Sequence, residues 1–230
     1  MFLVKKIVSK LPCRWQNEIK RLYFARQIKK NKFFTDEPEY NILHQLINQG
    51  DWVVDVGANV GHYTKRLSEL VGPSGRVIAL EPVSDTFSLL SANVNLFPFS
   101  NISLINVAAS DKLAIAGVSV PRFSSGLSNY YEARISSASN SIMSVLTITL
   151  DSLCIDHPIR LVKIDAEGHE DFVLRGMGGI IEKYHPVLIV ENPSDDAIRN
   201  LASSGYLNET LPKSPNVLFR PIKTIRTAGR

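Results

Sequence analysis

The chain has few cysteines, and the two that it has lack the neighbours that a metal or redox site needs. Cys13 and Cys154 belong to no CxxC or Cys/His cluster in the 230 residues, so no zinc site or redox pair is indicated. We expect both thiols to be free and Cys154 to be buried.

Long apolar runs are also absent from the sequence. No stretch approaches the roughly 20 apolar residues that a membrane-spanning helix needs. The opening segment MFLVKKIVSKL lacks the continuous apolar core of roughly 7 to 15 residues that a secretory signal carries. We therefore expect a cytoplasmic protein.

The remaining composition is that of a globular domain. Hydrophobic residues make up 44% of the chain and charged residues 21%, which argues against a disordered protein. A chain of 230 residues is long enough to bury one sizeable core, and no internal repeat or linker divides it. We expect one main domain; the sequence predicts no oligomeric state.

Acidic residues are scarce in the first part of the chain. Residues 1–32 hold ten lysines and arginines against one acid, Glu18, a net charge of +9 that leaves −5 for the rest of a chain whose total is +4. Apolar residues recur there near helical spacing. Two interpretations stay open: a basic amphipathic helix at an anionic membrane surface, or a helix that covers the domain with its lysines in water. No nucleic-acid module follows, so we expect no nucleic-acid partner.

Short apolar strands alternate with helices in the rest of the chain. We predict residues 1–35 to form a helical extension and residues 36–230 to form the domain. The expected helices are 36–48, 60–71, 84–96, 170–183 with a break at Gly178-Gly179, and 194–203; the expected strands are 52–56, 76–80, 102–107, 160–164, 186–190 and 217–220. This alternation predicts an α/β fold with a doubly wound, mostly parallel sheet and helices on both faces.

One region departs from the alternation. Residues 113–120 and 145–150 are β-rich, and the serine-rich stretch 121–144 between them is long for a compact domain. It carries Tyr130, Tyr131 and Arg134, which we expect to contact an acceptor when such a loop acts as a lid.

The first strand-to-helix turn predicts a ligand site. Gly57 allows a sharp turn, and Gly61 allows the new helix to pack closely on the strand. A dinucleotide site has a glycine where this chain has Asn59. Asp55 is unfavourable beside a phosphate but suits an ammonium or sulfonium group, so the turn favours S-adenosylmethionine over NAD. Glu81, after the second strand, is placed to accept hydrogen bonds from ribose hydroxyls in either case.

A second group of charged residues follows a later strand. In the segment KIDAEGHE, strand alternation puts Lys163 and Asp165 on one face. A buried Asp165 needs a cationic, metal or ligand partner, and Lys163 is one candidate. Glu170 has the position of a helix-start or packing acid.

The motifs GDWVVDVGANVGHYT, VIALEPV, NVAASD, TLDSL and KIDAEGHEDFVLRG together resemble those of the FkbM-type methyltransferases, from about Asp51 to Tyr206. The resemblance implies a class I methyltransferase fold, which is Rossmann-like, with S-adenosylmethionine as donor and a hydroxyl acceptor on a sugar or small metabolite. It also implies that Asp111 meets the adenine amino group.

A hydroxyl acceptor benefits from a nearby base. We expect Asp165 or Glu167 to orient or deprotonate it, with His169 as the alternative base, and Lys163 and Glu191 to contact it. These acids also offer oxygens to Mg²⁺, although no spacing here is diagnostic of a metal. Two other functions stay open: an NAD-linked oxidoreductase, and a non-catalytic module that binds S-adenosylmethionine.

Overall fold

The computed structural model describes residues 11–121, 133–136 and 143–222. The helices are α2 (Cys13–Lys29), α3 (Pro38–Leu46), α4 (His62–Val71), α5 (Ser84–Val94), α6 (Glu170–Arg175), α7 (Gly178–Tyr184) and α8 (Asp195–Ser203), with a 3-10 turn at Asp151–Leu153. The strands are β1 (Trp52–Val56), β2 (Arg76–Leu80), β3 (Ile102–Ile105), β4 (Ala108–Ala109), β5 (Ala114–Ser119), β6 (Arg134–Ser136), β7 (Met143–Ile148), β8 (Ile159–Ile164), β9 (Val187–Glu191), β10 (Tyr206–Thr210) and β11 (Asn216–Pro221).

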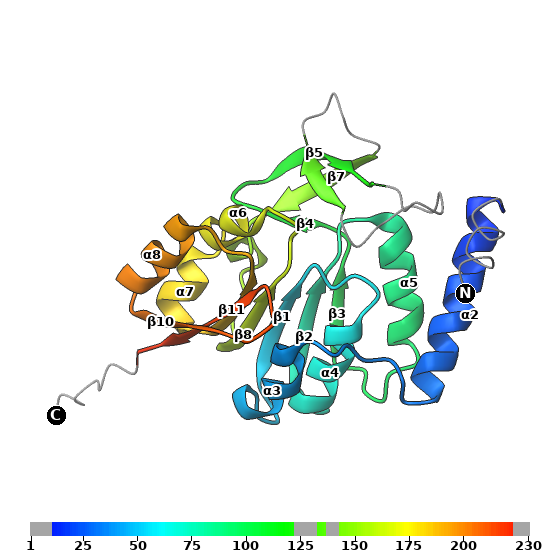
Figure 1. The fold of residues 1–230 in the computed structure, drawn as a ribbon, viewed down its shortest axis with the longest axis horizontal. Coiled ribbons are helices and arrows are strands. Elements are labelled where there is room, and N and C mark those ends of the chain that lie inside the picture. The colour runs from blue at the N-terminus through cyan, green and yellow to red at the C-terminus, as the bar shows by residue number, and fades with distance from the viewer. Residues whose placement is uncertain (1–10, 122–132, 137–142, 223–230) are drawn as a thin grey trace.

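The central sheet has the order β10-β11-β9-β8-β1-β2-β3 (Figure 1). Strands β3, β2, β1, β8 and β9 pair in parallel, while β11 pairs antiparallel with β9 and β10 antiparallel with β11. Because the chain leaves β1 for β2 on one side and later returns to β8 on the other, the strand order reverses at β1. Ligands of open α/β sheets bind at the carboxyl ends of strands at such a point.

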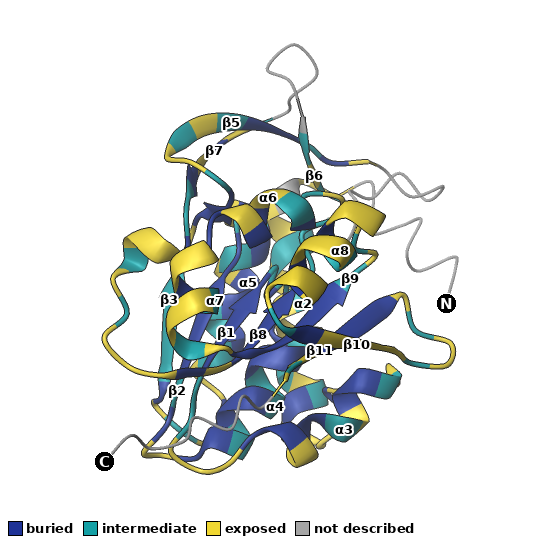
Figure 2. Cartoon of the chain, turned by 90° about the vertical axis from the view of Figure 1, so that its left-hand side faces the viewer, coloured by how far each residue is buried: buried dark blue, intermediate teal, exposed yellow. Residues whose placement is uncertain are grey.

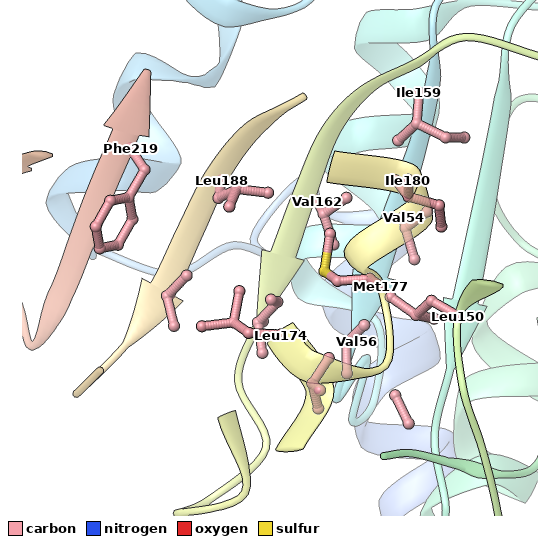
Figure 3. Packing of buried hydrophobic residues seen from close by; sticks show 14 of the residues in the cluster. Val54, Val56, Leu150, Ile159, Val162, Leu174, Met177, Ile180, Leu188 and Phe219 are labelled. Carbon is pink, nitrogen blue, oxygen red and sulfur yellow. The ribbon is translucent and has the colours of Figure 1, made fainter. Parts of the chain in front are cut away.

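Helices cover both faces of this sheet. Alternate residues of β1 point to opposite sides: Val54 and Val56 pack in the cluster formed with α6, α7 and α8, and Val53 packs with α3, α4 and α5. Figure 2 shows the central strands buried and the outward faces of the helices exposed. In Figure 3, the side chain of Met177 lies beside Val162 of the sheet. Burial on both faces explains why these strands are almost continuously apolar.

The smaller sheet has the order β4-β7-β5-β6 and lies over the carboxyl ends of the parallel strands (Figure 1). Strand β5 pairs antiparallel with both β6 and β7. The inner side of this smaller sheet packs through Val118 of β5 and Val145 of β7 against Val83, which follows β2. The smaller sheet thus covers the edge of the central sheet where the ligand site is expected.

Helix α3 is tied to distant parts of the chain by a fully buried acid. Glu39 accepts hydrogen bonds from Tyr63 Oη at 3.0 Å and Asn216 Nδ2 at 2.5 Å through one oxygen. Its other oxygen accepts from Ser214 Oγ at 2.7 Å. The carboxylate therefore joins α3, α4 and the segment that enters β11.

Helix α2 covers the domain, as one of the two interpretations of the basic segment requires. Phe24 and Ile28 on its inner face pack in the cluster that contains Phe33, Leu89 and Phe97. Among residues 11–121, 133–136 and 143–222, no helix is both long and apolar enough to cross a membrane.

Several details differ from the sequence-based expectations. The break predicted at Gly178-Gly179 lies earlier, at Gly176 and Met177. Gly176 lies against the backbone of Ser110, where an added β-carbon would be 1.9 Å from the carbonyl oxygen. Strands β4, β6 and β10 were not predicted, and β3 ends at Ile105 instead of at residue 107. Cys154, which follows the 3-10 turn and has φ of 48°, is exposed and not buried as predicted.

Candidate active site

The glycine loop lies against the loop that follows β8. Gly57 has φ of 76°, and a β-carbon there would lie 1.8 Å from the carbonyl oxygen of Asp165. The backbone N–H groups of Gly57 and Ala58 both donate to the Leu80 carbonyl. Asn59 has φ of 50°, in the left-handed region that asparagine tolerates better than most residues. The loop is therefore clamped between β2 and β8, and Gly57 is required by the close approach of two backbones.

Glu81 fixes the far side of the same loop. One of its carboxylate oxygens accepts from the Asn59 N–H and the other from the Val83 N–H, each at 2.9 Å. Burial raises the pKa of Glu81, these two hydrogen bonds oppose the shift, and the result is a pKa of about 7. The side chain borders the cavity described below. Glu81 thus presents an acceptor whose charge changes near neutral pH.

Asp55 lies beneath the loop and does not line the cavity. Its side chain is fully buried and accepts from Thr64 Oγ1 at 2.6 Å, and its second oxygen has no hydrogen-bond partner among the residues described. Burial raises the pKa of Asp55, while the Lys163 charge and the Thr64 hydrogen bond oppose that rise. The side chain of Asp55 therefore lies beside Thr64 and next to Lys163 on the neighbouring strand β8, and its contact with a cofactor stays a prediction.

Lys163 is a buried cation held by carboxylates and an aromatic ring. It is 2% exposed, its Nζ donates to Asp165 at 2.9 Å, and it lies 4.4 Å from the centre of the Tyr63 ring. Burial opposes the charge of Lys163, but Asp165 and Asp55 outweigh it and raise its pKa. The expected pairing with Asp165 is confirmed. Because Lys163 does not line the cavity, its expected contact with the acceptor has no support in this arrangement.

The structure brings together Asp165, Glu167 and Glu191, each of which offers a carboxylate oxygen within 4.8 Å of the others. Burial alone would raise the pKa of Asp165, but the Lys163 charge and a hydrogen bond from Glu191 hold it below its usual value. Burial, the Asp165 charge and this hydrogen bond raise the pKa of Glu191 to about 8. The opposite directions of these two pKa shifts make Asp165 the more acidic member of the pair and Glu191 the more basic one.

The backbone at Glu167 is strained, and hydrogen bonds to Glu170 stabilise it. Glu167 has φ of 52° and Gly168 has φ of 91°. The buried Glu170 accepts from the Ala166 N–H at 2.9 Å and from the Gly168 N–H at 3.1 Å with a single oxygen. Glu170 therefore serves as the helix-start acid that the sequence predicts.

These groups surround a cavity of about 220 Å³ at the carboxyl edge of the sheet. Its polar lining comes from Asn59, Glu81, Asp165, Glu167, Glu191 and Glu37, and its apolar lining includes Val83, Val107, Ala108, Val118 and Ile135. Glu37 was not predicted from the sequence. Tyr63 Oη donates to it at 2.5 Å, and that pairing places it at the rim.

Other predicted site residues lie outside this lining. His169 pairs with Ser110 Oγ at 2.9 Å and stacks on Phe172, and burial lowers its pKa. Asp111 lies 3.7 Å from Arg175 Nε, and Arg134 is exposed on the opposite side of β6 from Ala133 and Ile135. Tyr130 and Tyr131 fall outside the described residues.

A larger cleft of about 750 Å³ lies between α6, α7 and α8. It contains none of the predicted site residues and lies on a face of the sheet, away from the carboxyl ends of the strands. The smaller cavity is the candidate site, because the strand reversal, the glycine loop and the shifted carboxyl groups all meet there.

Two solved structures resemble this fold. A methyltransferase from Geobacter sulfurreducens matches with a TM-score of 0.50 and 14% identity over 92% of this chain and 91% of that chain. Methyltransferase FkbM from Methylobacillus flagellatus matches with a TM-score of 0.54 and 16% identity over 89% of this chain and 58% of that one. These likenesses show that the fold is that of the class I S-adenosylmethionine-dependent methyltransferases.

The model of the methyltransferase FkbM domain matches residues 55–207, and the chain belongs to this family. It is 27% identical over 183 residues, 76% of its length, to the hexuronic acid methyltransferase AglP of Haloferax volcanii, of which 72% is covered. It is also 34% identical over 73 residues to a ribosomal RNA large subunit methyltransferase E of Methanothermobacter thermautotrophicus, covering 30% of this chain and 34% of that relative. Membership of this family supports a methyltransferase, and not the NAD-linked oxidoreductase or the non-catalytic binding module.

Proposed function

We propose that this enzyme methylates a hydroxyl group of a sugar or glycan. The family match supports the methyl transfer, and the similarity to a hexuronic acid methyltransferase supports the sugar. The observation that carries the proposal is the hydrogen-bonded pair of Asp165 and Glu191 in the wall of the cavity, beside the glycine loop. An acceptor hydroxyl needs both an oriented position and a proton acceptor, and this pair offers both.

The cavity fits S-adenosylmethionine, which supplies an electrophilic methyl group when bound. Glu81 is placed to accept hydrogen bonds from ribose hydroxyls, because its carboxylate is fixed by two backbone N–H groups and borders the cavity. Val83, Val107 and Ala108 line an apolar part that suits the adenine ring. Gly57 and Asn59 of the glycine loop also line the cavity. We retain Asp111 as an adenine contact only as a prediction, because it lies outside this lining.

Glu191 is the base that the geometry favours, with Asp165 as the group that positions it. Asp165 stays ionised beside Lys163, so it is a weak base that holds the Glu191 carboxyl through their hydrogen bond. Glu191, with a pKa of about 8, is basic enough to accept a hydroxyl proton once it has lost its own. A base whose pKa lies near the working pH transfers protons most effectively.

Glu167 and His169 take different places in this proposal. Glu167 lines the cavity beside the pair and is placed to orient a second hydroxyl of a sugar. His169 is directed at Ser110 and does not line the cavity, so we do not propose it as the base. The proposal assigns no divalent cation; Asp165, Glu167 and Glu191 each offer one oxygen for such an ion, within 4.8 Å of one another.

The proposal is tested with a methyl-labelled donor and a panel of acceptors. The panel contains hexuronic acids, neutral hexoses and aromatic hydroxyl compounds, and the product mass identifies the methylated group. We expect label in a sugar, and we expect Asp165→Asn and Glu191→Gln to lower the rate while Glu209→Gln, at an exposed acid of β10, does not. Methylation of the aromatic compounds alone contradicts the sugar acceptor, and parent rates in both cavity variants contradict the assigned roles.

A further inference from the structure

Helix α2 exposes an apolar stripe that faces away from the domain. The exposed fractions are 72% for Leu22, 62% for Trp15, 57% for Tyr23, 39% for Ile19 and 37% for Leu11, just before the helix. Spacings of three and four residues put these side chains on one side of a helix. We call this set the α2 stripe.

The fold does not need the α2 stripe. Phe24 and Ile28, on the other side of the helix, supply its packing on the domain, where they join Phe33, Val60 and Leu89. Figure 1 shows α2 alongside α5 at the edge of the molecule, and no helix or strand of the described residues lies outside it. Contiguous apolar groups left in water beyond the needs of packing mark a contact surface.

Positive charge surrounds the α2 stripe. Exposed cations on α2 and the turn after it are Arg14, Arg21, Arg26, Lys29, Lys30 and Lys32. The one acid within α2 is Glu18, whose carboxylate pairs with Arg21 at 3.1 Å. The surface is therefore both apolar and strongly cationic.

These two properties select among partners. A second copy of the chain would bring like charges together, which opposes association through this face. A nucleic acid would use the cations but leaves Leu22 and Ile19 without a function. An anionic bilayer uses both, because lipid headgroups attract the cations and the apolar side chains enter the headgroup boundary, where tryptophan and tyrosine are favoured.

We propose that α2 binds the surface of an anionic lipid bilayer through the α2 stripe. The helix lies in the plane of the surface, and the domain remains in water on its other side. Asn17 of α2 donates to Asp85 at 3.3 Å in the first turn of α5, just after Val83 of the cavity wall. Binding through α2 therefore holds the cavity near the lipid surface. This inference does not depend on the identity of the methyl acceptor.

Tryptophan fluorescence of the full chain tests the proposal directly. The chain has two tryptophans; Trp15 is exposed, whereas Trp52 is stacked on His157 at 4.2 Å within the domain. We expect vesicles of phosphatidylcholine with about one third phosphatidylglycerol to shift the emission to the blue, and vesicles of phosphatidylcholine alone to have little effect. Trp15→Phe removes the shift without removing the binding, which sedimentation with the vesicles measures.

Two matched leucine variants distinguish vesicle binding through the α2 stripe from nonspecific binding through any exposed leucine. Leu22→Glu is expected to weaken vesicle binding by about tenfold or more, because it replaces an inserted side chain by a charge. Leu207→Glu, at a leucine of β10 that is 63% exposed, is expected to bind as the parent does. Raising the salt concentration also weakens parent binding, because it screens the cations.

Four results would overturn the proposal. They are no sedimentation with the anionic vesicles, equal binding to phosphatidylcholine alone, equal loss in Leu22→Glu and Leu207→Glu, and a dimer in solution that Leu22→Glu dissociates. Methyl transfer to a free sugar is measured beside these assays. If the protein methylates a free sugar but does not bind vesicles, only the lipid contact is refuted. If it binds vesicles but methylates no sugar, only the proposed function is refuted.

Discussion

The backbone carbonyl of Asp165 occupies the space that a side chain on Gly57 would need. A β-carbon at Gly57 would lie 1.8 Å from that oxygen, which no rotation of a side chain can relieve because the obstacle is backbone. This contact fixes the glycine loop against the loop after β8 that carries Asp165 and Glu167. The positions of the glycine loop and of the loop after β8 therefore depend on each other.

Gly57→Ala is expected to destabilise the fold by about 3 kcal/mol, as the sum of backbone strain and overpacking. Gly205→Ala is the matched control, because Gly205 has φ of 84° but nothing within 4 Å of an added β-carbon; it should cost about 1 kcal/mol. Urea unfolding measures both. Equal losses in the two variants would show that positive φ, and not the Asp165 contact, dictates glycine at position 57.

Replacing Glu81 by glutamine is expected to lower the affinity for S-adenosylmethionine by about tenfold or more, because an amide cannot accept from both backbone N–H groups and the ribose. With a pKa of about 7, the carboxylate of the parent ionises as pH rises through 7. Parent affinity should therefore fall as pH drops below 7, and the variant should lack this dependence. Calorimetry across pH measures both effects. Unchanged affinity in a folded variant would remove Glu81 from the cofactor site.

Glu191→Gln tests the proton acceptor. In the parent, kcat/KM should rise with pH through about 8, because Glu191 must lose its own proton before it accepts another. The variant should be slower by about a hundredfold and should lack the rise. If kcat/KM still rises near pH 8 in Glu191→Gln, the titrating group is not Glu191.

Protein stability gives a second measure of the same proton. Because the folded pKa of Glu191 lies above its ordinary value of 4.5, the folded state binds this proton more tightly than the unfolded state does. The parent should therefore lose stability as pH rises from about 4.5 to 8. Glu191→Gln removes this contribution, so its unfolding free energy should fall less over that range.

Lys163→Met leaves Asp55 and Asp165 without their buried counter-charge. We expect a loss of about 3 kcal/mol at neutral pH. The loss should shrink as pH falls, because without the cation both carboxyls take up protons more readily. Lys65→Met, at a more exposed cation paired with Glu69 on α4, should cost less than about 1 kcal/mol. If Lys163→Met does not fold, adding Asp165→Asn should restore part of the stability; no recovery would contradict the pairing.

Much of the central sheet is predictable because its strands are buried on both faces. A run such as Trp52–Val56, followed by glycines and then a helical pattern, has few other interpretations in a soluble domain. Strand β10 (Tyr206–Thr210) lacks this signal, since every residue after Tyr206 is exposed. Its structure comes from antiparallel pairing with β11, which local sequence does not encode.

The site is predictable where the chain itself sets the geometry. Lys163 and Asp165 are two residues apart on one strand, so their pairing follows from alternation. Glu37 reaches the cavity through Tyr63, 26 residues later, and no pattern near Glu37 reveals that contact. Alternation along β1 also predicts that Asp55 lies on the side of Val53, in the layer that holds Thr64, and the hydrogen bond from Thr64 agrees with this placement.

The buried Glu39 has a consequence for how the protein is made. Its partners Ser214 and Asn216 lie 175 and 177 residues further along the chain. During synthesis, a chain that has not yet delivered β11 from the ribosome would have to bury this acid incompletely paired, which is costly. The layer formed by α3, α4 and β11 is therefore expected to close last, after the parallel strands have assembled.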